Sequence, residues 1–182
     1  MAHSCVRATC VARRVCGITL LEVLTAVVIL GILGFVGYIS YRPLLARAEA
    51  AQCMTNMRSL HTALVGYMQD KAQWPQPPEG LWEAEDQGPF EDWWIATLTP
   101  YGGTEVAWQC PTLRRLSRTQ PEEEQHRMHY EPTPFDERTM TPYRWATQPW
   151  LVEIGDIHGR GAHILFPDGS IRVMDDIVPP RR

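Results

Sequence analysis

One long apolar segment constrains this chain more than any other feature of its sequence. The segment ITLLEVLTAVVILGILGFVGYISY covers residues 18–41 and carries a single charged side chain, Glu22. At about 1.5 Å per residue, a helix over this segment is roughly 36 Å long, which is enough to cross a hydrocarbon core of about 30 Å. Residues 1–17 contain three arginines and no acidic residue, which favours a cytoplasmic N-terminus. We therefore expect a transmembrane helix over residues 18–41, with the chain after Tyr41 outside the cytoplasm.

Three other kinds of N-terminal segment fit less well. A secretory signal peptide has an apolar core of about 7–15 residues, shorter than this run, although small residues at Ala46 and Ala48 could follow it. A lipoprotein signal needs a cysteine directly after the apolar run, and none is there. A plain membrane anchor fits the length but does not explain Glu22. A charged residue at mid-membrane costs about 2.5–3.5 kcal/mol, so such residues usually have a specific partner.

The residues that lead into the apolar segment form a recognisable pattern. Arg13 and Arg14 are followed by Gly17 and then by ITLLE, which runs directly into the rest of the segment. This pattern resembles the N-terminus of type IV pilins and type II secretion pseudopilins. The resemblance implies that residues 1–17 are a leader peptide. A membrane peptidase would cut between Gly17 and Ile18 and then methylate the amine of Ile18.

The same resemblance gives Glu22 a role in assembly. Glu22 would be the fifth residue of the processed chain and would face the terminal amine of a neighbouring subunit, because a buried charge needs such a partner. The implied partners are the prepilin peptidase and methyltransferase, other pilin-like subunits and an inner-membrane assembly platform. The implied location is a single-pass protein of the bacterial inner membrane with a periplasmic C-terminal domain. This protein would later enter a pseudopilus or an extracellular filament.

Beyond Tyr41 the apolar residues recur at helical spacing with polar residues between them, which predicts an amphipathic helix over residues 42–74. Pro43 should bend this helix, and Trp74-Pro75 should end it. We expect this helix to be the spine on which a globular domain of residues 75–182 packs. Within that domain, residues 121–142 have few apolar side chains and predict an exposed loop.

The C-terminal region predicts β-structure. Short apolar and β-branched runs are typical of strands, and Asp168-Gly169 fits a tight hairpin turn between the last two. We expect a three-stranded antiparallel meander over residues 151–175, packed on the spine helix, and a further short strand at residues 105–108. The predicted fold is therefore α+β and pilin-like. The predicted strands of the meander are residues 151–155, 162–167 and 170–175.

The sequence GDIHG at residues 155–159 resembles a metal-binding run of phosphoesterases, but the chain lacks the rest of such a site. The residues after Gly159 include one histidine and no asparagine, too few ligands for two metal ions. His158 is instead followed by nine residues and then Asp168-Gly169. This spacing resembles a C-terminal signature of bacterial pilin-like proteins. We expect His158 to hydrogen-bond Asp168 or Asp156; a calcium ion held by Asp156 and Asp168 is the alternative.

The remaining residues that could carry chemistry are few. Once the leader is removed, Cys53 and Cys110 would be the cysteines left in an oxidising compartment, and a disulfide is expected, with two buried thiols as the alternative. His126 and His129 have a spacing that metal ligands can have, but solvated loop histidines are the expectation.

The functional prediction follows from these absences and from the resemblance. The net charge of −4 and the lack of a basic region argue against nucleic-acid binding. Without a catalytic triad, a carboxylate pair or a complete metal site, we expect no enzyme activity and no cofactor. The predicted function is a structural subunit of a pseudopilus or pilus-like filament. The alternative is a membrane-anchored periplasmic binding module that does not polymerise.

Overall fold

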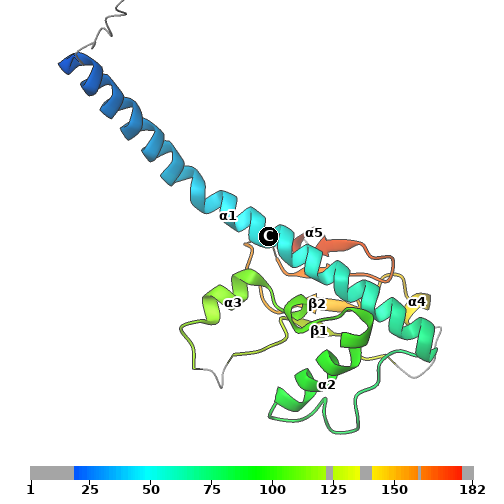
Figure 1. The fold of residues 1–182 in the computed structure, drawn as a ribbon. Coiled ribbons are helices and arrows are strands. Elements are labelled where there is room, and N and C mark those ends of the chain that lie inside the picture. The colour runs from blue at the N-terminus through cyan, green and yellow to red at the C-terminus, as the bar shows by residue number, and fades with distance from the viewer. Residues whose placement is uncertain (1–18, 122–124, 136–140, 160, 178–182) are drawn as a thin grey trace, which may run out of the picture. The chain divides into compact units, whose positions relative to one another are not determined.

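The computed structural model describes residues 19–121, 125–135, 141–159 and 161–177 (Figure 1). The chain divides into two units, Met1–Arg42 and Pro43–Arg182. A single helix, α1 (Leu20–Lys71), belongs to both units and continues through Pro43.

In the first unit, the N-terminal half of α1 presents its apolar side chains to the outside. Leu20 is 89% exposed, and the large apolar residues from Leu21 to Tyr41 are between 51% and 74% exposed. Thr19 stands at the start of the helix, where its hydroxyl accepts a hydrogen bond from the backbone N–H of Glu22 at 3.3 Å. By length and composition, α1 is the one helix among the described residues that could cross a membrane.

In the second unit, the C-terminal half of α1 supplies one wall of the core. Its buried apolar side chains recur every three or four residues, so they form one face of the helix. The helix ends at Lys71, three residues before the predicted end, and Ala72 follows with a φ of 56°. The buried apolar residues of this face are Cys53, Met57, Leu60, Ala63, Leu64 and Met68.

Short helices connect α1 to the sheet, and one of them replaces a predicted strand. The expected strand at residues 105–108 is wrong, because these residues form a 3-10 helix, η2. The side-chain amide of Asn56 donates to the carbonyls of Gln109 at 2.8 Å and Val106 at 3.5 Å, so hydrogen bonds from α1 hold this segment. The helices are α2 (Gly88–Leu98), η1 (Thr99–Tyr101), η2 (Glu105–Trp108) and α3 (Pro111–Ser117).

The sheet is a meander of four antiparallel strands in the order β1-β2-β3-β4 (Figure 1). Leu151 of β2 pairs with Leu165 of β3, and both side chains are fully buried. A short helix follows the last strand and another precedes the second. The strands are β1 (Tyr130–Pro132), β2 (Leu151–Glu153), β3 (His163–Leu165) and β4 (Ile171–Val173), and the helices are α4 (Thr141–Arg144) and α5 (Met174–Ile177).

Strand β1 corrects two predictions, the three-stranded sheet and the exposed loop over residues 121–142. Met128, Tyr130 and Phe135 of this segment are buried. The segment is also bonded through its backbone on both sides, since His129 donates to Trp108 and accepts from Ile154. A few apolar residues at alternate positions were therefore enough to make an edge strand. Residues 122–124 and 136–140 of the predicted loop lie outside the described residues.

Aromatic side chains fill the core between the helices and the sheet. Trp74, Trp94, Trp108 and Trp150 are fully buried. Trp74 packs edge-on against both Trp94 and Trp150, with ring centroids 6.2 Å and 5.4 Å apart. The predicted fold class is confirmed: a long N-terminal helix and a small C-terminal antiparallel sheet make an α+β, pilin-like fold.

Candidate functional site

The predicted processing site lies just before the first described residue, Thr19. Gly17 and Ile18 are outside the described residues. Glu22 is in the first turn of α1 and is exposed, and its backbone carbonyl accepts a hydrogen bond from the Thr25 hydroxyl at 2.9 Å. The carboxylate of Glu22 is thus presented on the outside of an apolar helix, where a group from another molecule can reach it.

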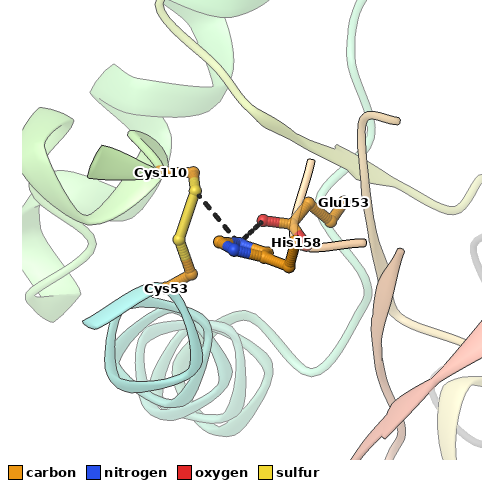
Figure 2. A group of neighbouring side chains, drawn as sticks. All are labelled: Cys53, Cys110, Glu153 and His158. Atoms are coloured by element: carbon orange, nitrogen blue, oxygen red, sulfur yellow. Dashed lines mark hydrogen bonds and ion pairs between the residues drawn. A yellow bond between two sulfur atoms is a disulfide. The ribbon is translucent and has the colours of Figure 1, made fainter. Parts of the chain in front are cut away.

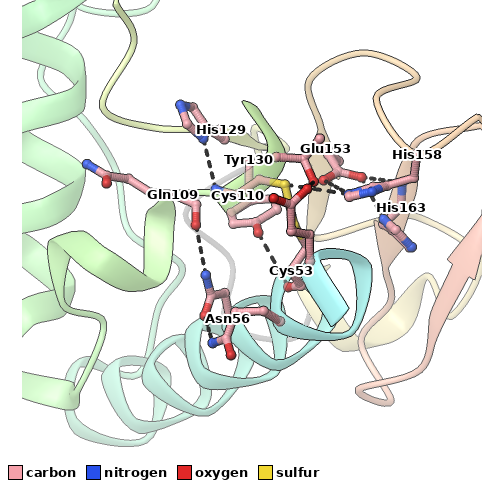
Figure 3. Close-up of a disulfide and its surroundings, with 12 residues drawn as sticks. Cys53, Asn56, Gln109, Cys110, His129, Tyr130, Glu153, His158 and His163 are labelled. Carbon is pink, nitrogen blue, oxygen red and sulfur yellow. Dashed lines mark hydrogen bonds and ion pairs between the residues drawn. A yellow bond between two sulfur atoms is a disulfide. The ribbon is translucent and has the colours of Figure 1, made fainter. Parts of the chain in front are cut away.

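A second group of functional side chains lies inside the globular unit, around a disulfide (Figure 3). Cys53 of α1 is bonded to Cys110, which directly precedes α3, and their Cα atoms are 5.1 Å apart. Both residues are fully buried. These are the two cysteines that the sequence analysis paired. The bond closes a loop across 57 positions of the chain and fastens the spine helix to the segment before α3.

Glu153 lies beside this disulfide with its carboxylate fully buried. One carboxylate oxygen, Oε1, is 3.2 Å from Nε2 of His158. The other, Oε2, is 2.6 Å from Nδ1 of His163 and accepts the backbone N–H of that residue at 3.1 Å. A buried carboxylate is tolerated when it is paired in this way, because its loss of hydration would otherwise be very unfavourable.

The structure corrects the predicted partner of His158. Its imidazole bonds Glu153 and not Asp156 or Asp168. Asp156 accepts the backbone N–H of Gly161 at 2.9 Å, within the loop between β2 and β3. Asp168 accepts the N–H of Ser170, and hydrogen bonds from Ser170 hold the pKa of this carboxylate below its usual value.

Glu153 was missed because it stands in LVEIG, which was interpreted only as a strand. A signal was present, since Glu153 is an acidic residue among apolar neighbours in that strand. Leu151 and Glu153 stand two positions apart on one face of β2, and both are buried. A carboxylate on the core side of a strand requires partners, and the nearby histidines were the available ones.

The Asp168-Gly169 turn has its own contact with the spine helix. Gly169 has a φ of 77°, and a Cβ added there would lie 3.3 Å from Cε1 of His61. Nε2 of His61 is 3.0 Å from the carbonyl oxygen of Pro167, and the His61 ring stacks on Trp150. The segment from His158 to Gly169 therefore contacts α1 or its disulfide at both ends.

His129 is buried, so the prediction that it is a solvated loop histidine is wrong. Its Nδ1 accepts the backbone N–H of Cys110 at 2.8 Å, and its Nε2 lies 3.0 Å from the carbonyl of His126. Burial lowers the pKa of His129, which favours the neutral ring. His126 is half exposed and lies 3.1 Å from the carboxylate of Glu91. Both histidines thus have partners within the protein, and these partners do not form a metal site.

A pocket of ≈ 480 Å³ opens beside His158. Glu49 on its wall is bonded to Arg115 at 2.9 Å and to the hydroxyl of Thr112 at 2.9 Å. The hydrogen bond from Arg115 is the main reason that the pKa of Glu49 is lowered, and Thr112 adds to the effect. The pocket is also lined by Ala50 and Met54 of α1, so it separates α1 from the loop that carries His158.

Comparison with known proteins bears on the first of these two sites. Residues 12–38 match the family model described as the prokaryotic N-terminal methylation motif. The methylation motif confirms the resemblance on which the processing prediction rests, and it supports a type IV pilin-like or pseudopilin-type protein. The motif spans Gly17, Ile18 and Glu22 and ends at residue 38, before the globular unit. No curated protein and no solved structure matches the chain significantly.

Proposed function

We propose that this protein is a structural subunit of a type II secretion pseudopilus or of a type IV pilus-like filament. In this proposal a prepilin peptidase cuts between Gly17 and Ile18 and methylates the new terminus. The observation that carries the proposal is the methylation motif, which leads directly into the exposed apolar half of α1. A helix with exposed apolar residues on all sides needs a lipid or protein environment. The membrane supplies lipid before assembly, and the core of a filament supplies protein after it.

Glu22 gives this assembly a means of setting the register. Its carboxylate is exposed on an apolar helix and would become buried between packed helices, where it needs a cation. The amine of Ile18 in a neighbouring subunit remains a cation after methylation and can provide that charge. Pairing the two would favour one axial offset between neighbouring helices over the others.

The globular unit would then serve as the outer part of the subunit. Its disulfide and the contact of the Gly169 turn with His61 connect it to α1, and the buried Glu153 with two histidines joins β2 to the segments that follow it. These contacts stabilise the fold, and we infer that the chain catalyses no reaction of its own. Its enzymatic partner is the peptidase, for which it is a substrate.

The proposal is tested by the N-terminus of the chain purified from membranes. We expect N-terminal sequencing and intact mass to give a chain that begins at Ile18 and carries one added methyl group. Gly17→Trp should leave residues 1–17 attached, whereas Ala12→Leu, a matched change inside the leader, should still be cut. A native chain that keeps its leader would contradict the proposal.

A second measurement separates the filament subunit from the membrane-anchored binding module. Filaments sheared from cells that overproduce the assembly machinery should contain the processed chain. If the processed chain stays entirely in the membrane fraction under these conditions, the binding module is the better description.

A further inference from the structure

The two cysteines of the disulfide and two neighbouring side chains converge on one point of the core (Figure 2). They are Cys53, Cys110, Glu153 and His158, and their potential ligand atoms all lie within 4.8 Å of one another. They come from four separate places in the fold: α1, the start of α3, β2 and the loop after β2. Two sulfur atoms, one imidazole nitrogen and one carboxylate oxygen make a ligand set typical of zinc.

We propose that this cluster is a redox-dependent zinc site. When the disulfide is reduced, the thiolates of Cys53 and Cys110 bind one zinc ion together with His158 Nε2 and Glu153 Oε1. The zinc ion then joins the same two points of the chain that the disulfide joins. This inference concerns the globular unit alone and does not depend on filament assembly.

The two distances from His158 Nε2 to its neighbouring ligand atoms are already close to those of a tetrahedral zinc site. With Zn–S of about 2.3 Å and Zn–N and Zn–O of about 2.0–2.2 Å, neighbouring ligand atoms lie about 3.4–3.8 Å apart. His158 Nε2 is 3.5 Å from Cys110 Sγ and 3.2 Å from Glu153 Oε1. All four ligand atoms already lie within 4.8 Å of one another, and binding zinc requires the sulfur atoms to separate from about 2.05 Å in a disulfide to about 3.8 Å.

Neighbouring residues hold these ligands in place from behind. His163 binds Oε2 of Glu153 with its ring and its backbone N–H, which leaves Oε1 directed at His158 and the sulfur atoms. His129 accepts the backbone N–H of Cys110 and so fixes the second cysteine. Such outer contacts orient metal ligands in known sites and strengthen metal binding.

The charge in the core is the same in both forms. The disulfide is neutral, so with an ionised Glu153 the site carries one negative charge. Zinc contributes two positive charges, which cancel the two thiolates and leave the same single negative charge. Without zinc, two buried thiolates would add two uncompensated charges, so the reduced cysteines would remain protonated thiols.

Reduction breaks the S–S bond with two electrons and two protons from a dithiol reductant, which becomes a disulfide. Zinc then displaces the two thiol protons to solvent. His158 binds through the lone pair of Nε2, so its ring proton must sit on Nδ1 in the zinc form. The pocket beside His158 brings solvent close to this side of the site.

The test uses the full chain in detergent with Cys5, Cys10 and Cys16 replaced by serine, so that Cys53 and Cys110 are the remaining cysteines. The protein is reduced with a phosphine, exposed to zinc chloride and separated from free metal. We expect one zinc ion per reduced chain and a higher Tm with zinc than without it. The oxidised chain should retain no zinc, and zinc should not change its Tm.

Variants assign the ligands. Glu153→Gln and His158→Gln should weaken zinc binding by the reduced chain at least tenfold, whereas His126→Gln, the same change at a histidine outside the cluster, should not alter it. Cobalt(II) in place of zinc should give the absorption bands of a tetrahedral, thiolate-bound ion in the reduced protein.

The proposal is wrong if the reduced chain retains no zinc, or if both variants bind zinc as tightly as the parent chain. If a variant fails to fold, the cobalt spectrum and the Tm of the unmodified cluster decide the question. Absence of thiolate-to-cobalt bands in the reduced, folded chain would overturn the site.

Discussion

The two halves of α1 are both rich in apolar residues, yet they have opposite surroundings. Leu30, in the first half, is 68% exposed, and Leu60, in the second, is 0% exposed. The second half is covered by the chain itself, through the aromatic core, the disulfide and the sheet. Within the described residues, the first half has no comparable cover.

This difference shows that one continuous helix serves two kinds of packing. Side chains of the second half contribute to the stability of a folded domain. In the proposed function, side chains of the first half contribute to contacts with other molecules, a membrane before assembly and neighbouring subunits after it. Substitutions in the first half should therefore change incorporation into filaments, and substitutions in the second half should change the stability of the globular unit.

The largest effect is expected for Glu22→Ala, in the first half. Incorporation into filaments should fall by about two orders of magnitude or more, because removing one partner of a buried ion pair costs about 3–5 kcal/mol. Processing and the Tm of the globular unit should not change. The measurement is the amount of processed chain in sheared filaments, with Glu79→Ala, an exposed carboxylate of the globular unit, as the control. Normal filament yield from Glu22→Ala would remove the pairing argument.

A matched pair of leucines tests the second half. Leu60→Ala should lower the free energy of unfolding by about 2–5 kcal/mol, because it leaves a cavity in the core. Leu30→Ala should change it by less than about 0.5 kcal/mol. Denaturant unfolding followed by tryptophan fluorescence measures both, since four tryptophans are buried in this core. Equal effects of the two substitutions would contradict the separation.

A smaller effect is expected where the hairpin turn meets the spine. Gly169→Ala should destabilise the unit by about 2 kcal/mol, since it combines a positive φ with a new contact to His61. Gly80→Ala tests the effect of the positive φ alone, because Gly80 has a φ of 86° and open space around its Cα. This substitution should destabilise the unit by about 1 kcal/mol. Thermal unfolding of the two variants should rank them in this order; the reverse ranking would show that His61 moves aside freely.

The smallest effect concerns Glu49, near the start of the buried part of α1. Its pKa is lowered in the folded state by Arg115, so its contribution to stability is present above the unfolded pKa of about 4.3 and is lost as pH falls through the folded value. Arg115→Met should remove part of this acid-dependent loss and leave the stability difference between pH 6 and pH 8 unchanged. The measurement is the free energy of unfolding of both chains from pH 8 to pH 3. If both chains lose the same stability at acid pH, the Glu49–Arg115 pair does not contribute to it.

Local patterns in the sequence predicted the features that depend on local residues. Helical spacing identified α1, and Asp168-Gly169 identified the turn between β3 and β4. The fold class follows from these features. The methylation motif was recognisable for the same reason, since its residues are contiguous.

Features that depend on tertiary contacts were not predictable in the same way. The partner of His158 is decided by the position of β2 in the core, and strand β1 depends on hydrogen bonds with Trp108 and with β2. Residues 105–108 are apolar enough for a strand, but the side-chain amide of Asn56 in α1 donates to the carbonyl of Val106 and to that of Gln109, the next residue after them. In each case the deciding contact joins residues 5 to 53 positions apart in the chain. The local sequence pattern does not show such a contact.

The connection between His61 and Pro167 joins residues 106 positions apart. A ribosome adds about 5–20 residues per second, so roughly 5–20 seconds pass between the synthesis of His61 and that of its partner. During this delay the apolar face of α1 from Cys53 to Met68 has been made, but the sheet that covers it has not. The nascent chain therefore carries an uncovered apolar helix face until the last strands have been made.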